Sequence, residues 1–114
     1  MDLAQLRKEI DEIDRQLVGL YEQRMNICTE IAEYKIENHK PVFDKQREAE
    51  KIQKVCGLAE KEENKKGVEE MFTQLMSLSR KLQYGILLEH ENNDMFSFET
   101  CRELVDEHTK VIFQ

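Results

Sequence analysis

Hydrophobic residues recur at alternating steps of three and four along the first third of the chain. They occupy Leu3, Leu6, Ile10, Ile13, Leu17, Leu20, Ile27, Ile31 and Tyr34, with Arg24 in a position of the same series. This spacing predicts a heptad-like helix of more than thirty residues. Such a helix is roughly 50 Å long, whereas a compact domain of this size has a radius of gyration of ~13 Å. The helix must therefore extend beyond its own monomer, and its apolar stripe predicts an obligate or near-obligate homodimer.

The segment ENHKPVFDK, residues 37–45, interrupts this pattern. Asn38 suits a helix C-cap, Pro41 cannot continue a helix, and Asp44 is a good N-cap for a second helix. That second helix has a thin apolar face and ends near the charge run EKEENKKG, residues 60–67, which we interpret as a solvated connector.

A third helix is predicted from Val68 to about Glu91. Residues 92–98 look turn-like, residues 99–108 favour a short helix, and residues 109–114 form a β-prone run without a partner strand. Because a lone strand is unstable, we predict a helical domain over residues 1–91, followed at 92–114 by a linker and the start of a truncated α/β domain.

Composition agrees with an all-α fold of three helices, one of them very long. The 114 residues include four Gly, one Pro and no Trp, and 36% of them are charged, which argues against an all-β sandwich. The net charge of -7 argues against nonspecific binding to nucleic acid or to an anionic membrane. Any anionic ligand must therefore find a local basic pocket.

No apolar run approaches the ~20 residues that span a bilayer, and the N-terminus is charged where a signal peptide needs its apolar core. We therefore expect a cytoplasmic protein. The three cysteines and three histidines are widely scattered, which favours reduced thiols and predicts no metal site.

Polar residues within the apolar seams are the candidates for function. Arg24 lies in the first helix, and Ser79 and Gln83 lie in the third. A structural salt bridge at Arg24 and interhelical hydrogen bonds at the other two are the simpler explanations. However, Lys35 follows Arg24 by eleven residues, nearly three whole turns, so both cations project from one face and could converge on one small dianion.

Arg7 precedes Arg24 by seventeen residues, which rotates it by about 100° and displaces it by roughly 25 Å. It could reach the same ligand only from a partner chain; as a single residue it could equally be an exposed side chain.

Asp44, Arg47 and Glu48 share the first turn of the second helix, where free N–H groups attract anions or hydroxyl oxygens. The three helices show no nucleophile and base pair, phosphate loop or acidic metal cluster, which fits a plain binding pocket or catalysis by positioning and electrostatics.

These residues resemble the all-helical, AroQ-class chorismate mutases, which are intertwined three-helix homodimers. The resemblance covers residues 3 to about 90 and is strongest in LRKEIDEIDRQLVGLYEQR, EIAEYK, HKPVFDKQRE and FTQLMSLSRKLQ. Each pocket position of the family holds a suitable residue here: Arg7, Arg24, Lys35, Asp44, Arg47, Glu48, Ser79 and Gln83. The resemblance implies conversion of chorismate to prephenate in phenylalanine and tyrosine biosynthesis, an intramolecular Claisen rearrangement that requires no cofactor.

The resemblance also implies a role for each residue. Arg24 and the partner's Arg7 would hold the two carboxylates of chorismate, supported by Ser79 and Arg47. Glu48 and the backbone at Asp44 would take the ring hydroxyl. Lys35 and Gln83 would be the catalytic pair, hydrogen-bonding the ether oxygen as negative charge develops on it.

The tail has a weaker resemblance of its own. TKVIFQ is similar to the first strand of the prephenate dehydratase domain that follows the mutase in bifunctional P-proteins. Two alternatives to a mutase stay open: an isochorismate pyruvate lyase of the same fold, and a noncatalytic helical dimerisation module. The second of these predicts no convergence of Arg24, Lys35 and Gln83.

Overall fold

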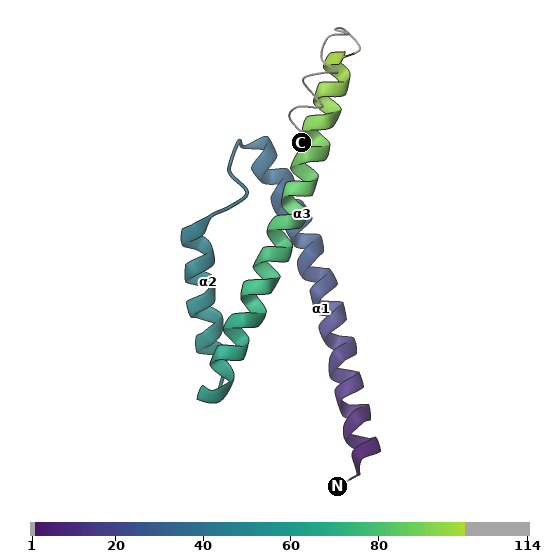
Figure 1. The fold of residues 1–114 in the computed structure, drawn as a ribbon, viewed down its shortest axis with the longest axis vertical. Helices are drawn as coiled ribbons and strands as arrows, with labels where there is room; N and C mark the ends of the chain where they lie inside the picture. The colour runs from purple at the N-terminus through teal and green to yellow at the C-terminus, as the bar shows by residue number, and fades with distance from the viewer. Residues whose placement is uncertain (1, 100–114) are drawn as a thin grey trace.

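The computed structural model describes the backbone of residues 2–99 and the side chains of residues 2–93. It consists of α1 (Leu3–Glu37), α2 (Lys45–Leu58), a short 3-10 helix η1 (Glu62–Asn64) and α3 (Lys65–Glu99) (Figure 1). The described part of the chain contains no strand, so the predicted all-α class with three helices is confirmed. None of its helices is long and apolar enough to cross a membrane.

The helix termini form where the local sequence predicts them. The Asp2 side chain caps the start of α1, and the Asn38 backbone N–H closes its end by bonding to the Tyr34 carbonyl oxygen. His39, the next residue, takes a left-handed φ of 54°, which reverses the chain after α1. The Asp44 carboxylate then accepts a hydrogen bond of 3.0 Å from the Arg47 backbone N–H and caps α2.

The predicted bounds of the third helix were wrong at both ends. It begins at Lys65 rather than at Val68, so the predicted connector shrinks and includes η1. It continues to Glu99 because residues 92–98 contain neither Gly nor Pro, and the moderate helix propensities of Asn, Asp and Ser do not stop a helix. The predicted domain boundary after residue 91 therefore falls within α3, and the predicted elements in 100–114 lie outside the described residues.

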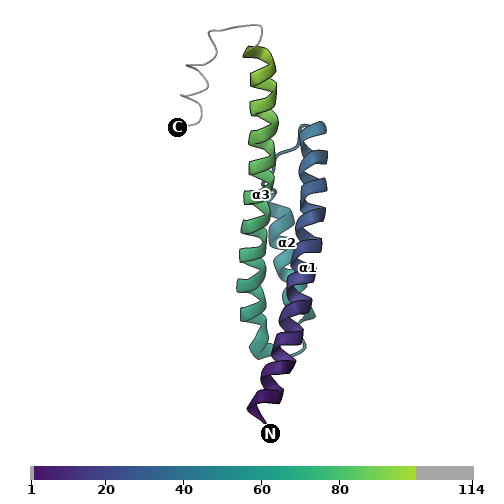
Figure 2. The same ribbon diagram turned by 90° about the vertical axis from the view of Figure 1, so that its right-hand side faces the viewer.

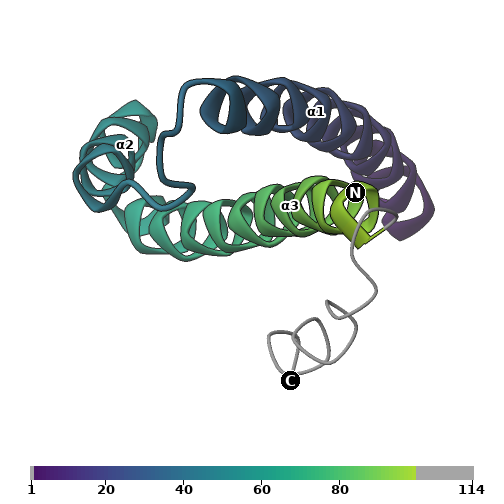
Figure 3. The same ribbon diagram turned by 90° about the horizontal axis from the view of Figure 1, so that it is seen from above.

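The molecule is elongated, with a radius of gyration of 20.1 Å and extents of 69 × 33 × 24 Å. α3 packs against both α1 and α2; Figure 1 shows α1 and α3 crossing each other, and Figure 2 shows that both follow the long axis of the molecule. Viewed from above in Figure 3, α2 closes one end of the space between these two long helices. This arrangement places side chains from all three helices around one interior region.

A single chain buries little apolar surface. Only Cys28, Ala32, Val42, Val55 and Met76 are buried hydrophobic residues among the described ones, whereas the apolar stripe of α1 is largely exposed: Leu3, Leu6, Ile10, Ile13, Leu17, Leu20, Ile27, Ile31 and Tyr34. A contiguous stripe of this kind is typical of a surface that packs against another protein chain.

Candidate active site

A pocket of about 380 Å³ opens between α1, the loop before α2, α2 itself and α3. Its volume is within the range of small-molecule sites. Seven of the eight residues that the sequence singled out line it: Arg24, Lys35, Asp44, Arg47, Glu48, Ser79 and Gln83. The lining is completed by Cys28, Ile31, Val42, Lys51, Met76 and Arg80.

Helical spacing explains how α1 and α3 contribute to this pocket. Arg24, Cys28, Ile31 and Lys35 follow one another at steps of four, three and four, so they share one face of α1. Ser79 and Gln83 are one turn apart on α3 and are only 7% and 6% exposed. The predictions that Arg24 and Lys35 share a face, and that Ser79 and Gln83 are buried in a seam, are confirmed.

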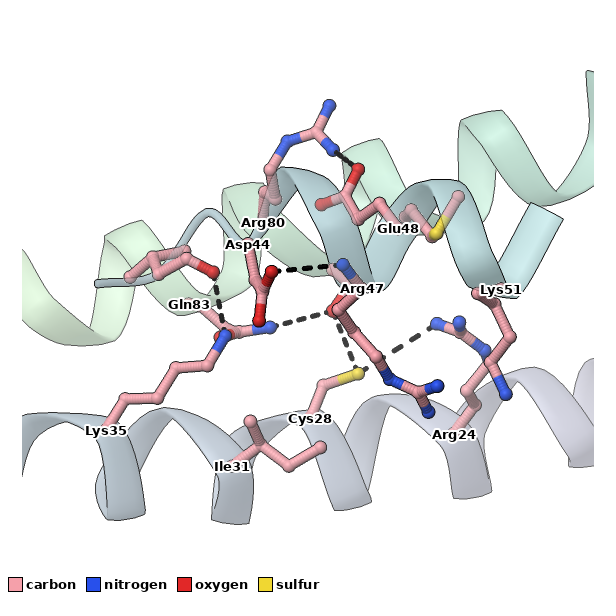
Figure 4. A pocket seen from close by; sticks show the side chains of 13 residues that line it. Arg24, Cys28, Ile31, Lys35, Asp44, Arg47, Glu48, Lys51, Arg80 and Gln83 are labelled. Atoms are coloured by element: carbon pink, nitrogen blue, oxygen red, sulfur yellow. Dashed lines mark hydrogen bonds and ion pairs between the residues drawn. The ribbon is translucent and has the colours of Figure 1, made fainter. Parts of the chain in front are cut away.

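A continuous series of hydrogen bonds connects these side chains (Figure 4). Lys35 Nζ donates to the Val42 carbonyl oxygen at 2.7 Å and to Gln83 Oε1 at 3.1 Å. Gln83 Nε2 donates to Ser79 Oγ at 3.0 Å, and Ser79 Oγ donates to Cys28 Sγ at 2.9 Å. At the other end, Arg24 Nη1 donates to the same sulfur at 4.0 Å. The series holds Lys35 and Gln83 next to each other from two different helices.

Donor hydrogens remain for a ligand in this arrangement. An ammonium group has three hydrogens, and Lys35 uses two of them. A side-chain amide has two, and Gln83 uses one. The two groups can therefore each donate one further hydrogen bond to an oxygen atom in the pocket without breaking the bonds that orient them.

Glu48 is held by a residue that the sequence analysis missed. Its Oε1 accepts a hydrogen bond from Arg80 Nη1 in an ion pair between α2 and α3. The Arg80 guanidinium also lies over the Phe43 ring, 5.1 Å from its centroid. The sequence did not indicate that Arg80 belongs to the site, because Arg80 is adjacent to Ser79 and neighbouring helix residues point in different directions. The charges of Arg80 and Glu48 come together only because α2 packs against α3.

Positive charge dominates the pocket. Five cationic residues line it, Arg24, Lys35, Arg47, Lys51 and Arg80, against the two carboxylates of Asp44 and Glu48. The structural salt bridge considered for Arg24 does not form with any of the described carboxylates; the Arg24 guanidinium donates a hydrogen bond to the Cys28 sulfur instead. Although the chain is acidic overall, the pocket is suited to an anionic ligand.

Arg7 is the one predicted site residue that does not line the pocket. It lies exposed near the start of α1, far along the helix from Arg24. This agrees with the spacing argument that one straight helix cannot bring both side chains to one small molecule.

No metal site is visible in the described part of the chain. Residues 2–93 contain no group of three His, Cys, Asp or Glu side chains arranged to hold an ion.

The Asp44 cap allows a test of local stability. Asp44→Ala is expected to lower the free energy of unfolding by about 1 kcal/mol, because the Arg47 N–H loses its acceptor. The change should appear in thermal unfolding followed by circular dichroism at one fixed protein concentration. Asp44→Asn keeps a side-chain oxygen at the cap and should recover most of the loss; equal destabilisation by both variants would contradict the capping role.

Residues 6–84 match the family described as chorismate mutase type II. A chorismate mutase of Methanocaldococcus jannaschii is 33% identical over 95 residues, which cover 81% of this chain and 94% of that protein.

Two bifunctional chorismate mutase/prephenate dehydratases of Buchnera aphidicola are also similar. The one from the Schizaphis graminum strain is 38% identical over 60 residues, covering 53% of this chain and 16% of the relative. The one from the Acyrthosiphon pisum strain is 39% identical over 72 residues, which cover 63% of this chain and 18% of the relative. The chain thus corresponds to less than a fifth of these two relatives. No solved structure matches it significantly.

The match to the family spans more than two thirds of the chain and includes every residue that lines the pocket. The chain therefore belongs to the type II chorismate mutase family.

Proposed function

We propose that this protein is an isomerase that converts chorismate to prephenate. The observation that carries the proposal is the pairing of Lys35 Nζ with Gln83 Oε1, at 3.1 Å, in a cationic pocket. In the Claisen rearrangement an ether C–O bond breaks while a C–C bond forms within the same molecule. The electrons move around one ring of atoms, so the step needs neither a cofactor nor a proton transfer.

Lys35 and Gln83 act on the ether oxygen in this proposal. Partial negative charge develops there as the C–O bond breaks, and the unused hydrogens of the two side chains donate to it. Because the hydrogen bonds of Lys35 to Val42 and of Gln83 to Ser79 already fix these donors, little reorganisation accompanies the reaction. The rest of the acceleration comes from holding the flexible substrate in its compact, reactive conformation.

The remaining residues bind the substrate. Arg24 holds one carboxylate, with Arg47 and Ser79 in support, and the partner's Arg7 holds the other. Glu48 accepts a hydrogen bond from the ring hydroxyl through its second carboxylate oxygen, since the first accepts one from Arg80. The backbone at Asp44 contributes to the same contact, while its side chain caps α2.

A homodimer completes this site in the proposal. The exposed stripe of α1 supports it, because a second copy packed along that stripe would bury the stripe and could deliver Arg7. That residues 92–114 lead into a dehydratase domain stays a prediction, which the names of the two Buchnera relatives support. The cytoplasmic location also stays a prediction.

Incubation of the purified protein with chorismate tests the function. We expect chorismate to disappear and prephenate to form in equal amounts. Release of pyruvate instead would indicate the lyase, and the absence of any product would favour the noncatalytic module. The convergence of Arg24, Lys35 and Gln83 on one pocket argues against that module.

A further inference from the structure

Three cations line one part of the pocket without a carboxylate partner. Arg24 comes from α1, and Arg47 and Lys51 are one turn apart on α2. In Figure 4 the Lys51 and Arg24 side chains approach each other from their two helices at one end of the pocket. None of the three forms an ion pair with a described carboxylate.

Both acidic residues of the pocket are engaged elsewhere. Asp44 accepts the Arg47 backbone N–H as the cap of α2, and Glu48 pairs with Arg80. The three cations therefore repel one another in the unliganded protein, and an anion bound among them would relieve this repulsion.

Lys51 carries the clearest sign of this repulsion. Partial burial lowers its pKa below the ordinary value, and the positive charges of Arg47, Lys54 and Arg24 lower the pKa further. Since the sequence places Lys51 among the many charged residues of α2, nothing in the pattern singled it out as part of the site.

We propose that Lys51 is a further substrate-binding residue, whose ammonium group joins Arg24 and Arg47 in holding one carboxylate of the substrate. This rests on the proposed function and extends it, because the carboxylate then has three cationic ligands from two helices. Lys51 lies away from the Lys35 and Gln83 pair, so it contributes to binding and not to the chemical step.

Steady-state kinetics with chorismate test this role. Lys51→Met keeps the apolar stem but removes the charge, and we expect KM to rise about tenfold or more while kcat stays within about twofold. Lys51→Arg should restore most of the affinity. Lys54→Met is the matched control: it removes the same charge from the next part of α2, outside the pocket lining, and should change KM by less than about twofold.

The pH dependence gives a second readout. A bound carboxylate favours the charged ammonium, so affinity is full while Lys51 is protonated in the free protein and falls as the pH rises through its lowered pKa. KM of the wild type should therefore rise at a lower pH than the pH at which a lysine of ordinary pKa loses its proton. The charges that act on Lys51 are those of Arg47 and Lys54 from α2 and Arg24 from α1. The other titratable or charged groups that line the pocket are Cys28, Lys35, Asp44, Glu48 and Arg80. Lys51→Arg should lack the part of this rise that is due to Lys51, because arginine does not titrate there.

Three outcomes would overturn the proposal: equal KM values for Lys51→Met and Lys54→Met, a loss confined to kcat, or an unchanged alkaline rise in Lys51→Arg. Circular dichroism verifies that each variant is folded, and Lys51→Gln replaces Lys51→Met if the latter is not. If the wild type shows no turnover, the proposed function fails separately. Calorimetric titration with chorismate then decides on Lys51: weaker binding by Lys51→Met alone supports its role, and equal or undetectable binding refutes it.

Discussion

Replacement of Lys35 by alanine is expected to lower kcat by about 10² to 10³-fold. The side chain is the donor that joins α1 to Gln83 on α3, and in the proposed reaction it stabilises negative charge that exists only in the transition state. An interaction of this kind affects kcat and kcat/KM together, whereas loss of simple binding would raise KM. Initial rates over a range of chorismate concentrations separate the two effects.

Two comparisons make this test specific. Lys40→Ala removes the same charge from an exposed position nearby and should leave the rate nearly unchanged. Gln83→Ala should also reduce kcat, and the double variant should lose less than the product of the two single losses, because the two residues share one hydrogen bond. A folded Lys35→Ala protein with kcat within threefold of the wild type would remove Lys35 from its proposed catalytic role.

Two inactive variants are expected to restore each other's activity when their chains are mixed. Arg7→Ala and Arg24→Ala should each lose at least about 30-fold in kcat/KM, since in the proposed site each removes a charged partner of a substrate carboxylate. If Arg7 acts in the partner's site, a mixed dimer has one site with both arginines and one with neither. Random exchange makes half of the dimers mixed, so activity should return to about a quarter of the wild type.

The exchange requires unfolding and refolding of the mixed chains, because a dimer that buries the α1 stripe does not dissociate readily. Each variant refolded alone serves as the control and should stay inactive. Sedimentation equilibrium should give twice the chain mass of 13.6 kDa for every sample. Dimers that regain no activity on mixing would show that Arg7 serves its own chain or lies outside the site, and a monomeric wild type would refute the shared site altogether.

Several features followed from local sequence because their causes are local. Asp44 and Asn38 mark helix ends through hydrogen bonds to residues within four positions, so the helix bounds near them were predicted well. The same reasoning failed at residue 91, where no Gly or Pro ends the helix and α3 continues to Glu99. Polar residues in the seams were likewise visible, since periodicity alone shows that Ser79 and Gln83 occupy apolar positions.

The amino-acid sequence by itself determined the number and order of the long helices, though not the ends of α3, and the face of α1 that carries Arg24 and Lys35, because these depend on spacing within one element. Only the tertiary structure decided which groups meet across elements. It brought Arg80 of α3 to Glu48 of α2, joined Lys35 to Gln83, and placed Lys51 beside Arg24. The physical reason is that side chains distant in the chain interact only at the distances and orientations set by helix packing, which no single periodic pattern encodes.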